Sequence, residues 1–204
     1  MATAPLRGGA VFCHPHPLHG GTMHTKAVFR GAQALNDAGF HVLRFNFRGV
    51  GQSTGSHDDG RGEADDVRAA LDWFSSEHSE LPLLIGGFSF GSVVGLKVGF
   101  EDPRARALLG LGLPVRAWDL SGLADPEARG GRPLLLVQGE NDEFGTGQEL
   151  EAFAESMGPG AAVARIPGAD HYFHDRFDEL RAAITPFFLE GAGSEPFPVL
   201  EGAR

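Results

Sequence analysis

The sequence predicts an α/β protein, a three-layer α/β/α sandwich with a mostly parallel sheet of about six strands. Short apolar runs alternate along the chain with longer segments of helical periodicity, and such alternation is typical of parallel sheets covered by helices on both faces. The runs are nearly continuous in Val, Leu, Ile and Phe, as expected for strands buried on both sides. The six expected strands are Ala10–Cys13, His41–Phe47, Leu83–Phe88, Ala107–Leu113, Leu134–Gln138 and Ala162–Ile166.

Five helices are predicted between and after these strands, each from a stripe of apolar residues at helical spacing. Gly39 is a good C-cap residue and ends the first helix. Pro186 should kink or restart the last helix, because it removes one backbone donor. The expected helices are Lys26–Ala38, Glu63–His78, Phe90–Glu101, Gln148–Met157 and a last one whose apolar stripe is Phe177, Leu180, Ile184 and Phe187.

Length and composition indicate one domain. The 204 residues are 42% hydrophobic and 22% charged, which suits a single packed core. We expect this domain over residues 1–190, followed by a loosely held tail over residues 191–204 that carries Gly, Pro and Glu. The net charge of −10 argues against nucleic acid as a partner, because phosphate binding needs a basic surface.

Cysteine usage and the N-terminal residues predict a cytoplasmic protein with no membrane partner. Cys13 is the only cysteine, so an internal disulfide is impossible, which fits a reducing compartment. Residues 1–9 contain no apolar stretch like that of a signal sequence. The most apolar stretch, residues 83–100, is interrupted by glycines, serines and Lys97, and this indicates a strand followed by a helix instead of a membrane span.

A G-x-S-x-G pentapeptide at residues 87–91 predicts that Ser89 is a nucleophile. The motif follows an apolar strand directly and precedes a helical stretch. On so sharp a turn, side chains two positions either side of the serine would collide with neighbouring backbone, which explains the glycines. The helix that follows would point its free N–H groups and positive dipole end at a developing oxyanion. The alternative interpretation is a tight turn with a buried serine.

A serine hydroxyl is a weak nucleophile and needs an adjacent base. His171 follows the last expected strand, where a loop can bring its imidazole over the sheet toward Ser89. His174 is the main competitor, although a histidine in the first turn of a helix is usually a surface residue. The sequence therefore predicts His171 as the base.

The acid that orients this base should follow the preceding strand. Asp142 is the preferred candidate, because the turn at Gly139 lets the chain cross above the sheet edge before it. Glu140 and Glu143 are the alternatives. Asp170 is discounted because it is the chain neighbour of His171, and the side chains of neighbouring residues rarely face each other. The order Ser…Asp…His along the chain is the one typical of hydrolases with a G-x-S-x-G turn, the nucleophile elbow.

The loop after the first strand is expected to complete an oxyanion hole. One donor should be the backbone N–H of Phe90, the residue after the nucleophile. The second should come from residues 13–21, where Pro15 and Pro17 have no N–H to donate. His16 is the best candidate and Leu18 the next.

The same loop allows a rival interpretation as a metal site. His14, His16 and His19 could be zinc ligands, and this interpretation implies a metallohydrolase. No acidic ligand follows within the loop, and proline on both sides of His16 restricts the geometry. We therefore expect neither a metal nor another cofactor.

A Gly-rich stretch, residues 44–55, ends the second expected strand. It contains no strand–GxGxxG–helix unit and no P-loop lysine, so a phosphate site is the weaker interpretation. The stronger interpretation is structural, with Arg48 and Asn46 holding the loop against neighbouring strand ends. The carboxylates considered available to pair with arginine are Asp58, Asp59 and Asp65.

With these residues placed, the chain resembles the α/β-hydrolases, and more closely their small lidless, dienelactone-hydrolase-like branch. The resemblance covers roughly residues 10–190. It implies hydrolysis of carboxylic esters through an acyl-enzyme, with Ser89, Asp142 and His171 in the matching positions. The motifs that carry it are HPHPLHGGTM at 14–23, LRFNFRGVGQSTG at 43–55, DDGRGEADD at 58–66, GGFSFGS at 86–92, QGENDE at 138–143 and GADHYFH at 168–174.

The sequence departs from this family in two respects. Family members usually begin with two further strands, whereas about nine residues precede the first strand here, so a six-stranded sheet with an exposed edge could favour a homodimer. Dienelactone hydrolases proper carry cysteine at the elbow, and Ser89 therefore does not imply lactone specificity.

The expected function is hydrolysis of small carboxylic esters. Only 20 residues separate Leu113 from Leu134, which is too short for a helical lid and favours small soluble substrates. A thioesterase, amidase or acyltransferase would use the same three residues, and a catalytically inactive interaction protein is the alternative of another class. The residues expected to line the substrate pocket are Leu18, Phe88, Trp118, Phe144 and Tyr172.

Overall fold

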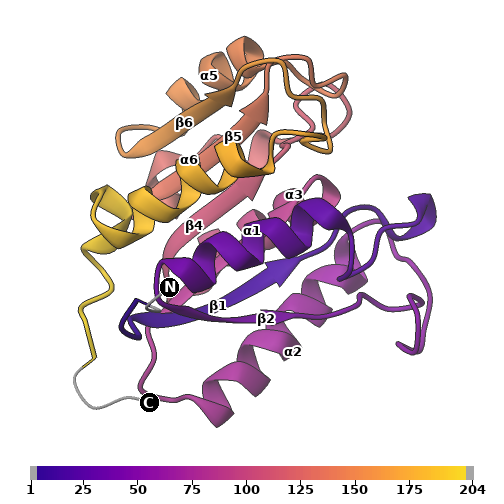
Figure 1. Cartoon of the computed structure of the whole chain (residues 1–204). Helices are drawn as coiled ribbons and strands as arrows, with labels where there is room; N and C mark the ends of the chain where they lie inside the picture. The colour runs from indigo at the N-terminus through magenta and orange to yellow at the C-terminus, as the bar shows by residue number, and fades with distance from the viewer. Residues whose placement is uncertain (1–3, 201–204) are drawn as a thin grey trace.

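The computed structural model describes residues 4–200 and contains one sheet of six parallel strands (Figure 1). The strand order across the sheet is β2-β1-β3-β4-β5-β6. All neighbouring strands pair in parallel, which confirms the predicted fold class. The strands are β1 Gly8–Cys13, β2 Phe40–Arg44, β3 Leu83–Phe88, β4 Ala105–Leu111, β5 Leu134–Gly139 and β6 Ala161–Ile166.

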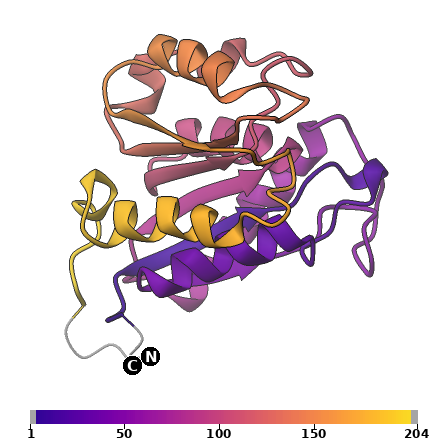
Figure 2. The same cartoon turned by 45° about the horizontal axis from the view of Figure 1, so that its top comes forward.

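Helices cover both faces of the sheet and complete the three layers. Helices α1 and α6 contact each other and lie together on one face, while α2, α3 and α5 lie on the other (Figure 2). The helices are α1 Lys26–Asp37, α2 Arg61–Glu77, α3 Phe90–Glu101, the single turn α4 Pro126–Arg129, α5 Gly147–Ser156 and α6 Phe177–Leu189, with short 3-10 turns at Pro17–His19, Ser121–Leu123 and Ala192–Ser194.

The sheet separates the core into two clusters because successive strand residues point to opposite faces. In β1, Val11 packs with the α2 and α3 side chains, whereas its neighbour Phe12 packs with those of α1 and α6. Both residues are fully buried. Burial on both faces explains why the strands are uninterrupted apolar runs in the sequence.

The strand order also determines where a site can form. The chain leaves β1 for β2 in one direction, then crosses back over β1 to β3 and continues the other way to β6. The carboxyl ends of β1 and β3 therefore lie on either side of the point where the order reverses. In open parallel sheets this crevice is where ligands bind.

Several boundaries differ from those predicted, each for a local reason. Strand β2 ends at Arg44 and not at Phe47, because the Phe47 N–H donates to the His14 ring instead of to β1. Helix α2 begins at Arg61, two residues before Glu63, because the Glu63 carboxylate accepts from the N–H of Gly60 and so extends the first turn.

Pro186 does not interrupt the last helix, contrary to the prediction. Helix α6 runs through it to Leu189. Only one backbone hydrogen bond is lost, and it is lost close to the end of the helix. The hydroxyl of Thr185 donates to the carbonyl of Ala34 at 2.9 Å, and Phe188 is fully buried, so tertiary contacts hold this turn.

The tail after residue 190 is not loosely held over its described part. Phe197 is fully buried, and its ring lies 4.7 Å from that of Phe40. The N–H of Leu200 donates to the carbonyl of Leu6 at 3.0 Å. This part of the tail therefore packs as an extension of the core, and residues 201–204 lie outside the described residues.

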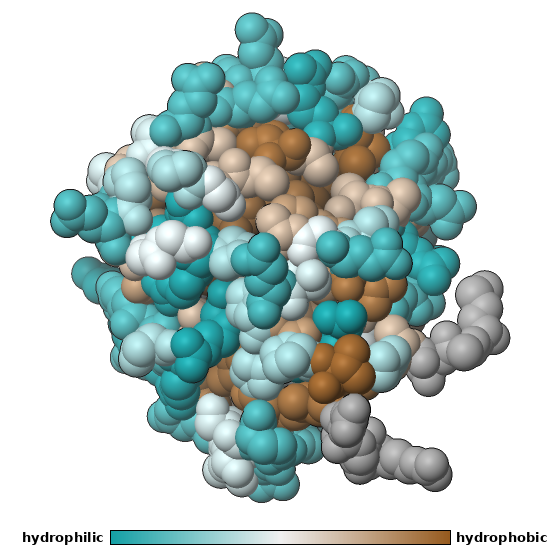
Figure 3. Space-filling model, turned by 90° about the vertical axis from the view of Figure 1, so that its left-hand side faces the viewer, coloured by the Kyte–Doolittle hydropathy of each residue, from teal (hydrophilic) through white to brown (hydrophobic). Residues whose placement is uncertain are grey.

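Figure 3 shows the face of the molecule away from the carboxyl ends of the strands. Hydrophilic residues cover most of the outer part of this face, and apolar residues are visible toward its middle. Helix α3 ends here, and Arg132 donates to the carbonyls of Gly99 at 2.6 Å and Phe100 at 2.9 Å, which satisfies the last turn of that helix. Across residues 4–200, none of the helices combines the length and apolar character that crossing a bilayer requires.

Candidate active site

Ser89 occupies a strained turn between β3 and α3. Its φ of +57° lies in the left-handed region that L-residues rarely adopt. The glycines two positions either side are required by contact: a Cβ on Gly87 would lie 2.3 Å from the Gly91 carbonyl oxygen, and one on Gly91 would lie 2.3 Å from that of His14. The Ser89 N–H donates to the Leu111 carbonyl at 2.8 Å, so the turn is tied to β4.

Ser89, His171 and Asp142 form one hydrogen-bonded chain. His171 Nε2 lies 2.9 Å from the Ser89 hydroxyl oxygen, and His171 Nδ1 lies 2.8 Å from Asp142 Oδ2. Asp142 is 1% exposed and His171 2%. A carboxylate only accepts, so the network assigns the proton to Nδ1 and leaves Nε2 free to accept the hydroxyl proton. The chain is arranged to make the serine oxygen nucleophilic.

The imidazole of His171 is held by packing as well as by hydrogen bonds. Phe88 lies beneath it with ring centroids 4.9 Å apart, and Phe144 lies beside it at 4.7 Å. Gly112 has a φ of +55°, and a Cβ there would approach the Phe88 ring to 2.8 Å and His171 Cε1 to 3.2 Å. The packing of His171 on Phe88 therefore requires glycine at position 112, a role that was not predicted from the sequence.

The other acids and bases considered from the sequence lie elsewhere. Glu140 pairs with Arg165 at 2.7 Å, and Glu143 is exposed. His174 is exposed and bonds with Asp170 at 2.7 Å. None of these four lies between Ser89 and a buried carboxylate, so the structure favours His171 and Asp142.

Two backbone N–H groups near Ser89 are available as donors. Within residues 4–200, the N–H groups of His16 and Phe90 meet no acceptor. The Leu18 N–H, the other candidate, is already donated to the His16 ring at 3.2 Å. Close packing of Gly91 on the His14 carbonyl brings the start of α3 against this loop, and His16, Ser89 and Phe90 line the same cavity.

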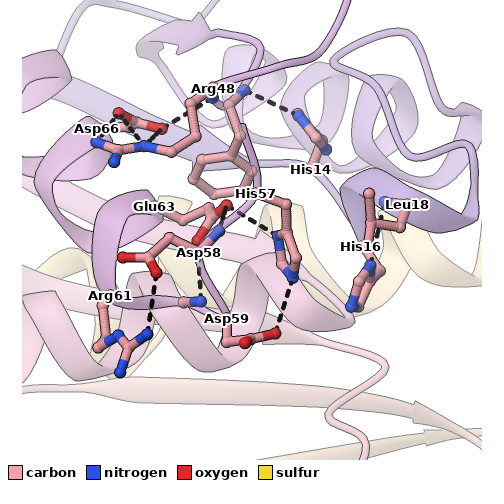
Figure 4. A network of polar contacts seen from close by, with 12 residues as sticks. His14, His16, Leu18, Arg48, His57, Asp58, Asp59, Arg61, Glu63 and Asp66 are labelled. Carbon is pink, nitrogen blue, oxygen red and sulfur yellow. Dashed lines mark hydrogen bonds and ion pairs between the residues drawn. The ribbon is translucent and has the colours of Figure 1, made fainter. Parts of the chain in front are cut away.

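His14 cannot serve as a metal ligand in this arrangement. Its Nε2 accepts from the Phe47 N–H at 3.0 Å, which is the dashed contact at His14 in Figure 4. Its Nδ1 lies 2.7 Å from the Pro15 carbonyl oxygen. Burial lowers the pKa of His14 to about 4, so the ring is neutral near pH 7. In the part of the chain that the structure describes, no group of three or more His, Cys, Asp or Glu side chains is positioned to hold a metal ion.

Cys13 lies next to this loop but is chemically quiet. The side chain is fully buried at the end of β1. Burial in apolar surroundings raises the pKa of the Cys13 thiol, so the reactive thiolate is not formed near neutral pH.

The Gly-rich stretch after β2 has the expected structural role, with a different partner. The Arg48 guanidinium pairs with Asp66 at 2.8 Å, whereas Asp58 pairs with Arg61 at 3.0 Å. Of the carboxylates considered available to arginine, Asp58 thus pairs as expected, and so does Asp65, with Arg68 at 3.0 Å, whereas Asp59 contacts His57. Arg48 takes Asp66 because the first turns of α2 turn Asp66 toward it. Asn46 accepts from the Met23 N–H at 2.9 Å.

A second carboxylate–imidazole pair, not foreseen from the sequence, lies beside the His16 loop (Figure 4). The fully buried Glu63 carboxylate lies 2.9 Å from His57 Nδ1 and accepts from the N–H groups of Asp58 at 3.1 Å and Gly60 at 2.9 Å. The His57 ring lies 4.7 Å from that of His16 and 5.5 Å from that of Phe90. Only the Glu at the third position of α2 hinted at this capping role.

A cavity of about 420 Å³ opens above Ser89. Three of the five residues expected to line it do so: Trp118, Phe144 and Tyr172. Phe88 does not, because it is fully buried beneath His171, and Leu18 does not, because it stands 71% exposed outside the cavity. The lining residues that the sequence analysis did not assign to the pocket are His16, His19, Gly20, Gly21, Thr25, Pro114 and Ala117, together with Pro15.

The connection between β4 and β5 leaves this cavity uncovered by a helical lid. It contains only the turn Ser121–Leu123 and the four-residue α4. The prediction from the 20-residue spacing is thereby confirmed.

Comparison with known proteins agrees with this geometry. The family model described as an alpha/beta hydrolase domain matches residues 11–182. The chain belongs to the alpha/beta hydrolase family. An uncharacterized protein of Rickettsia prowazekii (strain Madrid E) is 34% identical over 197 residues, which covers 92% of this chain and 81% of that protein.

Two solved structures of this family are similar along most of their length. An alpha-beta serine hydrolase homologue from Coxiella burnetii is 35% identical, with a TM-score of 0.82 over 89% of this chain and 86% of its own. A serine hydrolase without lid from Xanthomonas campestris is 32% identical, with a TM-score of 0.80 over 92% of this chain and 93% of its own. The lidless α/β-hydrolase fold is therefore shared.

Proposed function

We propose that this alpha/beta hydrolase is a serine esterase that cleaves small carboxylic esters through an acyl-enzyme. The observation that carries the proposal is the continuous chain from the Ser89 hydroxyl through His171 to the buried Asp142. Three groups from three separate strand ends meet there in the order that nucleophilic catalysis requires.

In the first half of the reaction, Ser89 Oγ attacks the ester carbonyl carbon while His171 Nε2 takes the hydroxyl proton. The negative charge that develops on the carbonyl oxygen is held by the N–H groups of Phe90 and His16. The tetrahedral intermediate then breaks its bond to the alcohol oxygen. His171 gives its proton to that oxygen, and the acyl group stays on Ser89.

Water completes the cycle by the same route. His171 takes a proton from water as its oxygen attacks the acyl carbon, and the bond to Ser89 breaks with return of the proton to Oγ. Throughout both halves Asp142 stabilises the imidazolium and keeps the ring in the tautomer that accepts at Nε2. No cofactor takes part in any of these steps.

Cavity size and lining support small substrates. About 420 Å³ of open, lidless space over Ser89 suits short acyl chains, and the rings of Trp118, Phe144 and Tyr172 offer apolar contact. Nitrophenyl esters of increasing acyl length provide the test. We expect kcat/KM to be highest for short chains, and a steep preference for emulsified long-chain lipids would contradict the proposal.

Labelling with a fluorophosphonate probe separates an active enzyme from an inactive interaction protein on this fold. Wild-type protein should be labelled at Ser89, and the Ser89→Ala variant should not be. A wild-type protein that stays unlabelled would overturn the proposal. A matched series of ester, thioester and amide substrates then distinguishes the esterase from a thioesterase, amidase or acyltransferase with the same residues.

A further inference from the structure

Gln138 is a buried polar side chain that the mechanism above does not use. It lies near the end of β5 and is fully buried. Its Nε2 lies 2.9 Å from Asp142 Oδ2, 2.6 Å from the Gly145 carbonyl oxygen and 3.3 Å from that of Leu113. Its Oε1 is buried and meets no donor within residues 4–200. A buried amide with one unpaired end needs a reason to be retained.

The surroundings determine which end of the amide faces Asp142. Three acceptors surround one terminal atom, and all three are oxygens. An amide oxygen placed there would oppose three other oxygens, so the atom must be the nitrogen. Its two hydrogens serve the two short contacts, to Asp142 Oδ2 and to the Gly145 carbonyl.

We infer that Gln138 is a positioning residue that fixes the Asp142 carboxylate for His171. The oxygen that Gln138 contacts, Oδ2, is the same one that accepts from His171 Nδ1, while Oδ1 accepts from the Phe144 N–H at 2.8 Å. Donors on both oxygens hold the plane of the carboxylate. The inference rests on the proposed function, because it assigns Gln138 to the same catalytic chain.

Gln138 also holds the loop that carries Asp142. Gly145 follows Asp142 by three residues. The Gln138 amide therefore contacts this loop twice, at the Asp142 carboxylate and at the Gly145 backbone carbonyl. The long contact to Leu113 reaches the segment that follows the neighbouring strand β4. One side chain of β5 thus holds both the acid and the loop that carries it.

A neutral amide suits this position better than a cation. A lysine or arginine beside Asp142 would neutralise the carboxylate and weaken its stabilisation of the imidazolium. An amide donates a hydrogen bond and leaves the negative charge available to His171. This predicts that the Gln138 amide affects proton affinity in the chain as well as geometry.

The test replaces Gln138 by methionine, which is similar in length and has no donor. In Gln138→Met we expect kcat/KM for a short ester to fall roughly 10- to 100-fold, mostly in kcat, because a hydrogen bond to a buried charged group is lost. The acid limb of the pH profile of kcat/KM should move to higher pH. A carboxylate that has lost a donor holds a proton in the Asp142–His171 pair more strongly, and that proton must leave before His171 can act as a base.

Two further variants separate this role from a merely structural one. Gln138→Leu removes the donor with a different apolar side chain, so the acid limb should move upward as it does in Gln138→Met. Thr185→Val is the matched control, because it removes a hydrogen bond of 2.9 Å to Ala34 on the opposite side of the sheet. It should lower the melting temperature and leave the acid limb in place. Far-ultraviolet circular dichroism checks that each variant is folded.

A measurement without substrate keeps the inference independent of turnover. The hydrogen-bonded His171 Nδ1 proton should give a low-field proton NMR signal, and the pH midpoint of that signal should be higher in Gln138→Met than in the wild type. If the wild-type protein hydrolyses no ester but the midpoint still rises, the proposed function fails and the positioning role stands. An unchanged midpoint and an unchanged acid limb in folded Gln138→Met and Gln138→Leu would overturn the inference.

Discussion

Two buried carboxylate–imidazole pairs lie at the same edge of the sheet in residues 4–200, and only one of them faces a serine hydroxyl. In both, a buried carboxylate contacts Nδ1 of a histidine, at 2.8 Å for Asp142–His171 and 2.9 Å for Glu63–His57. Both carboxylates also accept backbone N–H groups. By these local criteria the two pairs are equivalent.

The two pairs differ in the group that each histidine contacts through Nε2. His171 Nε2 meets the Ser89 hydroxyl at 2.9 Å, whereas His57 Nε2 meets the exposed carboxylate of Asp59 at 3.3 Å. His57 has an acceptor where a nucleophile would be needed. Glu63 also closes the first turn of α2, so its pair supports the fold. Of the two pairs, only Asp142–His171 has a hydroxyl within reach of its outer ring nitrogen.

The largest effect should come from removing the hydroxyl that distinguishes the two pairs. Ser89→Ala should lower kcat by roughly 10⁴- to 10⁶-fold, with residual turnover from the oxyanion donors. The double variant Ser89→Ala/His171→Ala should be hardly slower than the single one, because the residues act as a unit. Steady-state kinetics measures both, and additive losses would contradict a shared role.

Changing each carboxylate to its amide tests the comparison directly. Asp142→Asn should lower kcat roughly 10⁴-fold, because an amide can donate to Nδ1 and so favours the wrong tautomer of His171. Glu63→Gln should lower kcat less than about tenfold, because His57 does not take the serine proton. Similar losses in the two variants would show that the second pair also belongs to the reaction.

The Glu63–His57 pair, which should matter little for activity, should matter for the stability of the fold. Glu63→Ala leaves the N–H groups of Asp58 and Gly60 without their acceptor and should lower the free energy of unfolding by roughly 2–4 kcal/mol. Glu77→Ala, at an exposed position in the same helix, is the control and should change it by less than about 0.5 kcal/mol. Urea denaturation measures both, and equal effects would refute the capping role.

Another imidazole at this edge, the buried His14, has no carboxylate in contact and extends the comparison to the dependence of stability on pH. Burial lowers its pKa to about 4 from the ordinary value of 6.5, so between these values the unfolded chain binds more protons than the folded one. Stability is therefore full above about pH 6.5 and is lost as the pH falls. Between pH 6.5 and 5 the loss should be roughly 2 kcal/mol.

The variant His14→Asn should show a weaker dependence of unfolding free energy on pH over this window. His24→Gln, which changes an exposed histidine, should keep the wild-type dependence. Urea denaturation at several pH values measures all three proteins. Identical slopes for wild type and His14→Asn would assign the dependence to other groups.

Much of the site could be predicted because its signals are local. The elbow is set by contacts between residues within two positions of Ser89, and glycine is the only residue that such contacts permit at positions 87 and 91. Its place after an uninterrupted apolar run identified β3 and the edge of the sheet. The positions of Asp142 and His171 followed from their places after β5 and β6.

The two wrong pocket predictions concern features that local sequence does not determine. Phe88 was expected in the pocket because it is aromatic and adjacent to Ser89, yet strand alternation turns it beneath His171. Leu18 was expected there because it lies in the right loop, yet the turn Pro17–His19 directs it to solvent. Both errors concern side-chain direction, which sequence position alone does not determine in a loop or at the end of a strand.

By itself the sequence determined the order of strands and helices, the strained serine turn and the strand ends at which partners must lie, because apolar periodicity and glycine sterics act over a few residues. The sequence proposed His171 and Asp142 among several candidates, and the tertiary structure decided that this imidazole reaches the hydroxyl and this carboxylate the imidazole. The contact of Gln138 with the carboxylate came from the tertiary structure alone. Ser89 and His171 are 82 residues apart in the chain, and contacts over such a distance depend on how the whole sheet is assembled.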